Sequence, residues 1–158
     1  MAAPTHTNRV TPTGIDLWDG FVSKITFAND TNITFWEKSV KLPGLDGGEA
    51  IKRSTMINSV YHTKHPGGLV DVLATTAKVA YCLQSYTDII AIINDETTVT
   101  VTVCDGSQIS FFGYLQKFEA DDLAPNTHPE ATITVMPTMY DYENNVESTF
   151  LITEVTGT

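Results

Sequence analysis

Three stretches of the chain alternate apolar and polar residues with a period of two: residues 97–104, 107–118 and 130–137. Successive side chains of a strand point to opposite faces, so this alternation predicts strands with one buried and one solvent-facing side. The dipeptide Asp105-Gly106 lies between the first two runs and predicts a tight hairpin turn. Gly113, inside the second run, is predicted to mark a β-bulge.

Shorter apolar runs predict four more elements. Residues 19–28 and 33–40 flank a cluster of turn-forming residues at 29–32, and together they predict a hairpin. A further strand is predicted within 71–82, and a last one within 150–155.

One segment, residues 83–94, has helical periodicity. Its apolar residues recur at helix spacing: Leu83, Tyr86, Ile89, Ile90 and Ile93. Asn94-Asp95 follows and ends the pattern. We expect one short amphipathic helix here, although its β-branched isoleucines lower the intrinsic helix propensity.

The segments between these elements lack any period. Residues 1–18 contain Pro and Gly breakers and are predicted to be an N-terminal arm, and residues 138–158 a C-terminal arm with a turn-like middle. Residues 41–70 form a long connection bracketed by Gly- and Pro-rich turns, and connections of this length are usually functional or disordered. The sequence therefore predicts one domain over 19–137, mostly β, an antiparallel sandwich or barrel flanked by one short α-helix.

Composition narrows the possible functions. The 158 residues are 42% hydrophobic and 18% charged, which suits a folded domain, and the formal net charge is −10. An acidic surface repels phosphate, so general nucleic-acid binding and docking to anionic membranes are not expected. No apolar run is long enough to span a membrane, and the polar N-terminus does not resemble a signal peptide.

Candidate chemistry is sparse, and no common catalytic motif is present, so we expect a non-enzymatic protein without a cofactor. His62-x-x-His65 lacks further metal ligands nearby, and two exposed loop histidines are the simpler interpretation. The acidic residues at 119–122 are either a calcium site or a solvated loop. Trp18 and Trp36 are either packing anchors or sugar-stacking platforms. Cys82 and Cys104 are expected to be reduced packing residues.

Two blocks of sequence carry a family resemblance. In residues 34–60 an apolar strand leads through the Gly-rich turn PGLDGG into the segment IKRSTMINSV. Residues 99–137 follow the order strand, Asp-Gly-Ser turn, aromatic strand FFGYL, acidic loop, strand ATITV and Pro137. In both blocks, and in their order, the chain resembles the major tail tube protein of long, non-contractile-tailed bacteriophages.

The resemblance implies a structural role in the virion. Six subunits would form a ring, the rings would stack into a hollow tube, and genomic DNA would pass through it into the host. The partners implied are further copies of the chain, the tape measure, tail terminator and distal tail proteins, with no membrane partner and with DNA only in transit. Such a protein is made in the host cytoplasm and resides in the phage tail.

The resemblance also assigns roles to residues. The 41–70 loop would reach the next ring, and its apolar residues are the stacking candidates, with a local mini-core under the loop as the alternative: Leu42, Leu45, Ile51, Met56 and Ile57. A bore should repel phosphate, so acidic residues near strand ends are the candidates for its lining: Asp105, Glu119, Asp121, Asp122 and Glu130.

Two other function classes remain open on sequence grounds. One is a different virion β-sandwich, such as a tail terminator, a head–tail connector or a capsid decoration protein. The other is a small carbohydrate- or cell-binding module, which would need exposed aromatic residues in a concave site.

Overall fold

The computed structural model describes residues 23–29, 35–148 and 150–154. The predicted N-terminal arm, residues 19–22 of the first predicted strand, most of the turn at 29–32, Trp18 and the last four residues of the chain lie outside this description.

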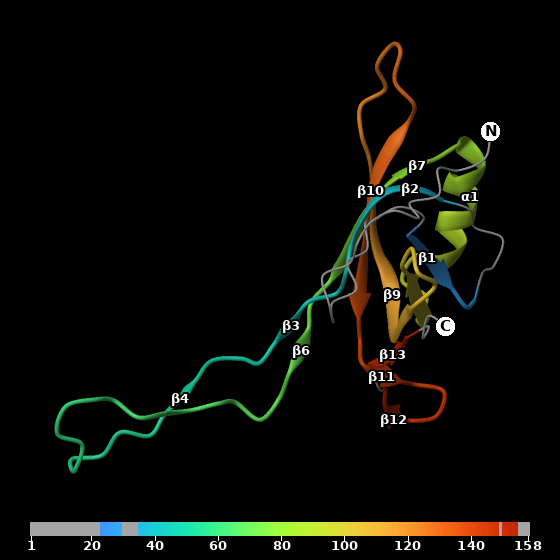
Figure 1. The fold of residues 1–158 in the computed structure, drawn as a ribbon. Coiled ribbons are helices and arrows are strands. Elements are labelled where there is room, and N and C mark those ends of the chain that lie inside the picture. The colour runs from blue at the N-terminus through green and yellow to red at the C-terminus, as the bar shows by residue number, and fades with distance from the viewer. Residues whose placement is uncertain (1–22, 30–34, 149, 155–158) are drawn as a thin grey trace.

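Seven strands form one antiparallel sheet, as the alternating patterns predicted (Figure 1). The hydrogen-bonded order is β1-β8-β9-β10-β7-β2, and β13 pairs with β9 outside this path. Their bounds are Lys24–Phe27 (β1), Trp36–Lys41 (β2), Thr75–Ala80 (β7), Thr97–Thr102 (β8), Gln108–Ala120 (β9), Glu130–Pro137 (β10) and Leu151–Thr153 (β13). The mostly β, antiparallel fold class is thereby confirmed.

Alternation along the strands builds the core. In β8 every second residue is buried, so the valines face inward while the intervening threonines face outward. The same pattern holds in β7 and β10. The largest fully buried side chains come from four strands: Phe111, Leu115, Ile133, Val79, Val99, Val101, Val135 and Thr75. Thr75 is the polar member of this group, and its buried hydroxyl has no hydrogen-bond partner among the described residues.

The sheet curls until its two ends meet, and this corrects one prediction. The segments 19–28 and 33–40 were expected to pair as a hairpin, yet β1 pairs with β8 and β2 pairs with β7. The two strands meet only across the seam, where the Ile25 N–H donates to Glu37 Oε1 at 2.9 Å. Local sequence signals a turn between the two strands, but curling of the whole sheet decides which strands they pair with.

Strand β9 pairs with three other strands, β8, β10 and β13, and it contains a β-bulge at a different residue from the one predicted. Opposite β10, the register shifts between Thr134 and Val135, which leaves Gln116 as the extra residue on β9. The bulge is therefore at Gln116 and not at Gly113. Gly113 instead allows a close backbone approach, since a Cβ there would lie 2.5 Å from the Met136 carbonyl oxygen.

Helix α1 (Leu83–Ile92) packs against the sheet, close to the predicted bounds. It ends where Asn94 adopts a left-handed backbone (φ 62°) and donates its N–H to the Leu115 carbonyl at 3.0 Å. The buried face differs from the predicted one, because Ile89 and Ile92 are buried whereas Leu83 and Ile90 point outward.

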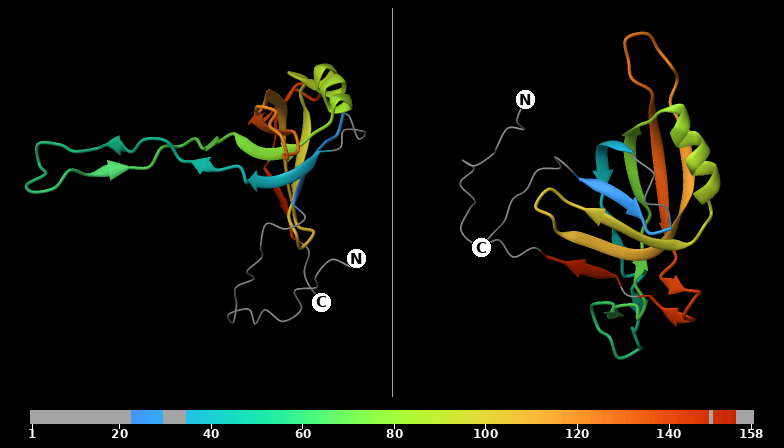
Figure 2. Two further views of the ribbon diagram at one scale, coloured as in Figure 1. Left: turned by 90° about the horizontal axis from the view of Figure 1, so that it is seen from above. Right: turned by 90° about the vertical axis from the view of Figure 1, so that its right-hand side faces the viewer.

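The chain between β2 and β7 leaves the sheet as a long two-stranded projection (Figures 1 and 2). Two short ladders hold it together, β3 (Leu45–Asp46) with β6 (Asp71–Val72) and β4 (Ile51–Lys52) with β5 (Lys64–His65). We call residues 42–74 the arm and residues 51–65 the outer arm. The predicted long loop is therefore an ordered hairpin, although it lacks the period-two pattern of a buried strand.

The C-terminal region forms a separate two-stranded hairpin and adds one strand to the seven-stranded sheet. Strands β11 (Tyr140–Asp141) and β12 (Val146–Glu147) form a small hairpin, residues 140–147, which we call the C-terminal hairpin. Strand β13 then pairs with Gln108–Ser110 of β9, so the predicted final strand is present. Among the described residues, no helix is long and apolar enough to cross a membrane.

Candidate assembly interface

The arm projects because its strands pair only with each other. At its root, the Leu73 N–H donates to the Gly44 carbonyl at 2.8 Å, and farther out the Arg53 N–H donates to the Thr63 carbonyl at 2.8 Å. No described core residue lies beyond this root. The arm therefore has a defined backbone path but no hydrophobic core of its own.

The tip of the arm is shaped by hydrogen bonds from polar side chains. Asn58 accepts the Thr55 N–H at 2.7 Å through Oδ1 and donates to the Tyr61 carbonyl at 3.2 Å. Ser54 Oγ accepts the Thr63 N–H at 3.0 Å and also lies 3.0 Å from His62 Nδ1. These bonds take the place of apolar packing in closing the hairpin, which leaves the apolar side chains of the tip free to face outward.

Four of the five stacking candidates are exposed along the arm. Met56 and Ile57 at the tip are 105% and 92% exposed, and Leu45 and Ile51 are also solvent-facing. This exposure excludes a local mini-core under the loop. Leu42 is the exception, because it lies at the root and packs against the sheet core.

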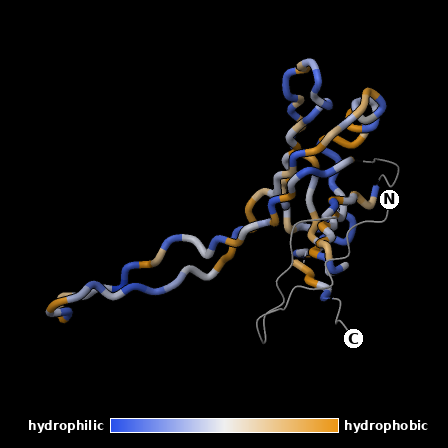
Figure 3. The backbone as a smooth tube through the Cα atoms, turned by 45° about the horizontal axis from the view of Figure 1, so that its top comes forward, coloured by the Kyte–Doolittle hydropathy of each residue, from blue (hydrophilic) through white to orange (hydrophobic). Residues whose placement is uncertain are grey.

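The arm displays more apolar surface than the sequence candidates alone. Val60 and Tyr61 are exposed at the tip, and Leu69 and Val70 are exposed just before β6, nearer the root. Coloured by hydropathy, the far end of the arm stands out as apolar against a largely polar stem (Figure 3). Clusters of exposed apolar side chains commonly mark protein–protein contact sites.

Four of the five bore candidates lie together where β9 and β10 leave the sheet. Glu119 lies 2.6 Å from Lys117 Nζ, and Asp121 lies 3.0 Å from Lys78 Nζ. Glu130 contacts Lys38 and Lys78. The hydrogen bond and charge of Asp121, with Glu130 nearby, raise the pKa of Lys78. Asp122 follows directly and is exposed.

Asp105 does not belong to this cluster. It caps the β8–β9 turn, where its carboxylate accepts the Ser107 N–H at 2.8 Å, and Gly106 has a positive φ of 89°. Strand β9 runs between this turn and Glu119. At about 3.3 Å per residue, that strand places the two sites on the order of 40 Å apart.

The sequence interpretation missed the C-terminal hairpin as a candidate surface. Its Tyr140 and Tyr142 rings pack edge to face with centroids 4.8 Å apart, and Tyr142 is 59% exposed. Asp141 accepts the N–H groups of Glu143 and Asn144, and Asn144 Nδ2 donates to Asp141 at 2.7 Å. These hydrogen bonds, the Asn144 side chain first, lower the pKa of Asp141. The signal was present as Asp141-x-x-Asn144, an Asx-type turn sequence.

Helix α1 offers a second exposed apolar surface. Leu83 and Ile90 are largely exposed, and Tyr86 and Ile93 are partly so. Tyr86 also packs against Tyr81 and Phe118, with ring centroids 5.5 and 5.1 Å away, which anchors the helix to the sheet.

The metal-ligand, cysteine and tryptophan candidates are accounted for within the described part of the chain. No group of three or more His, Cys, Asp or Glu side chains there is arranged to hold a metal ion. Cys82 and Cys104 are not joined by a disulfide. Trp36 is exposed on β2 but does not line either shallow hollow of the described surface, at the arm tip or across β2, β7 and β10.

Comparison with known proteins adds one structural likeness. No family model matches the sequence, and no curated protein matches it. The fold is similar to that of a chain in a solved structure described as "Cryo-EM structure of the anti-feeding prophage (AFP) baseplate, 6-fold symmetrised". The TM-score is 0.54 at 13% sequence identity, and the match covers 82% of this chain and 94% of that chain. At this identity, the similarity is one of fold.

Proposed function

We propose that the protein is a structural subunit of a phage tail. Six subunits form a ring, and the rings stack into a hollow tube through which DNA passes. The observation that carries the proposal is the arm. It has a defined path, no core of its own and an apolar tip at Met56 and Ile57 that is exposed in the described part of the chain. Burial of such a tip by a neighbouring copy removes apolar surface from water.

Two further observations support this proposal. The fold is similar to a chain from a structure described as a 6-fold symmetrised prophage baseplate. The resemblance of residues 34–60 and 99–137 to the tail tube family independently implies six copies. Identical subunits joined by a heterologous, head-to-tail interface form a closed ring when the rotation closes.

The charge cluster on β9 and β10 suits the wall of a DNA conduit. A wall with free lysines would bind phosphate and resist movement of DNA. Here Lys78 and Lys117 are each paired with a carboxylate, at 3.0 and 2.6 Å, and Lys38 with Glu130. We place this cluster toward the bore, where paired cations are poorly available to phosphate. Asp105, at the far end of β9, is assigned to an end of the ring.

A second candidate is a subunit that forms a single ring at the end of a tail. The baseplate likeness favours this alternative, because the structure that contains the similar chain is described as a baseplate. In that case the arm would contact a different protein, and the purified chain would not polymerise along an axis.

Electron microscopy of the purified full-length chain at rising concentration separates these candidates. The proposed function predicts hollow tubes with a regular axial repeat. Isolated rings would favour the terminal-ring candidate. A chain that stays monomeric at all concentrations would contradict both, and specific binding on a glycan array would then favour a carbohydrate-binding module.

A further inference from the structure

Positive charge in this acidic chain is concentrated on the outer arm. Residues 51–65 contain Lys52, Arg53 and Lys64 and no Asp or Glu. Since the whole chain carries −10 and this segment carries +3, the remainder carries −13. The outer arm is therefore opposite in sign to the net charge of the rest of the chain.

Among the described residues, the cations of the outer arm have no acidic partner within ion-pair distance. The ion pairs among described residues involve Lys38, Lys78 and Lys117, and none involves the outer arm. Lys52 and Lys64 are moreover direct partners across the β4–β5 ladder. Like charges placed directly opposite destabilise a ladder, so an acidic partner would relieve a repulsion built into the arm.

The C-terminal hairpin has the complementary surface. Asp141, Glu143 and Glu147 lie within eight residues that contain no Lys or Arg, and none of the three makes an ion pair in the described part of the molecule. Tyr142 and Val146 are exposed beside them. The hairpin thus combines unpaired carboxylates with aromatic surface, just as the outer arm combines unpaired cations with apolar side chains.

The acidic surface at the end of the β9–β10 hairpin is a poorer match. Its residues Glu119, Asp121 and Glu130 already contact lysines of the same chain. A cation of the outer arm would have to replace one of these lysines before it could pair fully with a carboxylate. The charges of the C-terminal hairpin need no such exchange.

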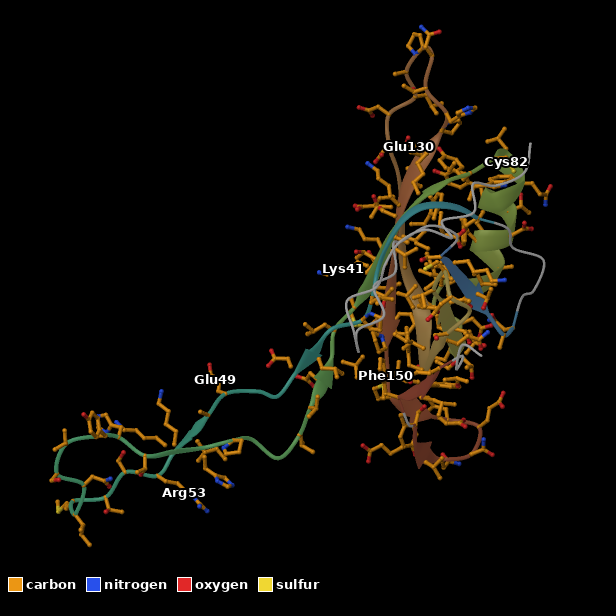
Figure 4. All side chains as sticks on the ribbon, in the orientation of Figure 1. Lys41, Glu49, Arg53, Cys82, Glu130 and Phe150 are labelled. Atoms are coloured by element: carbon orange, nitrogen blue, oxygen red, sulfur yellow. The ribbon has the colours of Figure 1, made fainter. Side chains whose placement is uncertain are left out.

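The arm reaches away from its own C-terminal hairpin. Arg53 lies far out on the arm, well clear of the sheet (Figure 4). From Leu45 to the tip at Ile57 the arm spans roughly 40 Å at about 3.3 Å per residue. Figure 1 and the left view of Figure 2 are perpendicular to each other, and both show the arm extending away from the sheet. The acceptor for the outer arm is therefore on a second copy.

We propose that the outer arm of one copy docks on the C-terminal hairpin of a neighbouring copy. Lys52, Arg53 and Lys64 face the three carboxylates, while the apolar tip packs against Tyr142. This inference rests on the proposed function and assigns its stacking contact to two defined surfaces.

Charge reversal and its rescue test the contact. The arm variant Lys52→Glu/Lys64→Glu and the hairpin variant Glu143→Lys/Glu147→Lys change equal numbers of charges and leave Asp141, which shapes the turn, intact. Each variant alone should raise the concentration needed for tube growth by about tenfold, and the four-substitution chain should return it to within about threefold of the wild type. Wild-type assembly should also weaken as salt screens the contact.

The matched control reverses two carboxylates elsewhere, Glu119→Lys/Asp122→Lys. Rescue of the arm variant by this control would overturn the inference and assign the contact to the β9–β10 hairpin. If the wild type forms tubes and the arm and hairpin variants form them at the same concentration, the inference is overturned while the proposed function stands. A wild-type chain that forms no oligomer would overturn both. Circular dichroism of the monomers checks that every variant folds.

Discussion

Two single residues, Gly113 and Glu37, lie where parts of the sheet come into close contact. At Gly113, strand β9 passes so near β10 that an added Cβ would lie 2.5 Å from the Met136 carbonyl oxygen and 3.2 Å from Pro137 Cα. Both neighbours are backbone atoms, which cannot swing aside as a side-chain end can. At Glu37, the two ends of the curled sheet meet through a hydrogen bond to Ile25.

Gly113→Ala should therefore destabilise the fold by about 1–3 kcal/mol, the usual cost of inserting a group into a filled space. Urea denaturation followed by circular dichroism measures the change in the free energy of unfolding. Gly47→Ala is the matched control, because a Cβ at Gly47 meets nothing within 4 Å. An effect at Gly113 no larger than that at Gly47 would show that the strands separate easily there.

Glu37 makes stability depend on pH. Burial in the seam raises the pKa of Glu37 above 4.5, against the lowering effect of the Ile25 N–H. Because the pKa is higher in the folded state than in the unfolded chain, the ionised carboxylate costs stability above the folded pKa. This cost is removed as pH falls through the folded pKa toward the unfolded value.

Glu37→Gln keeps an oxygen acceptor for Ile25 and removes the charge. We expect this variant to be more stable than the wild type at pH 7, with the difference shrinking as the pH approaches 4.5. Urea denaturation at several pH values measures both trends. A wild type that is more stable at pH 7 would mean that the carboxylate is a net stabilising group in the seam.

At the scale of elements, short-range sequence patterns predicted the strands, turns and helix that depend on one segment. They missed the strand pairings and the buried helix face that depend on several segments packing together. The alternation of 97–104 and 107–118 and the Asp105-Gly106 turn sufficed for the β8–β9 hairpin, because both strands bury one face on the same core. The pairing of β1 and β2 depended on curling of the whole sheet, which no local pattern records. The helix was found, but Ile90 faces outward because only the packed sheet decides which face is buried.

The candidate surfaces show the same division. The sequence marked Met56 and Ile57 as apolar residues in a polar segment, but it left open whether they are exposed or form a local mini-core; in the structure they are exposed. Pairing of Lys78 with Asp121 was not predictable, because the two residues are far apart in the sequence and meet only through the strand register of the folded sheet. The C-terminal hairpin was overlooked because two-residue strands carry no periodicity.

The arm should be separable from folding. Gly44 and Leu73 are hydrogen-bonded at its root, so a two-residue Asn-Gly turn in place of residues 45–72 would close the hairpin there. We expect the free energy of unfolding to stay within about 2 kcal/mol of the wild type, because the shorter loop costs less closure entropy. Tube growth should be lost. Thermal unfolding and electron microscopy measure the two effects. Tubes that still form would remove the arm from the stacking contact.

At the scale of the whole molecule, the structure combines a packed sheet with a projection that has no core. Strands β7, β9 and β10 hold the fully buried side chains Val79, Leu115 and Ile133, whereas the ladders β3–β6 and β4–β5 hold mostly exposed ones. Regions with few buried apolar contacts open at low free energy. Folding stability therefore belongs to the sheet, and the arm can order further when it binds.

Hydrogen exchange measured by mass spectrometry should display this division. In the monomer, amides of the sheet should exchange with nearly the global free energy of unfolding, while those of residues 51–65 exchange with little protection. In assembled tubes, protection should rise in two separate segments, the outer arm and residues 140–147, since each is covered by a neighbour. Protection of the outer arm already in the monomer would mean that it packs on its own chain, and a rise in the arm without one at 140–147 would place its partner surface elsewhere.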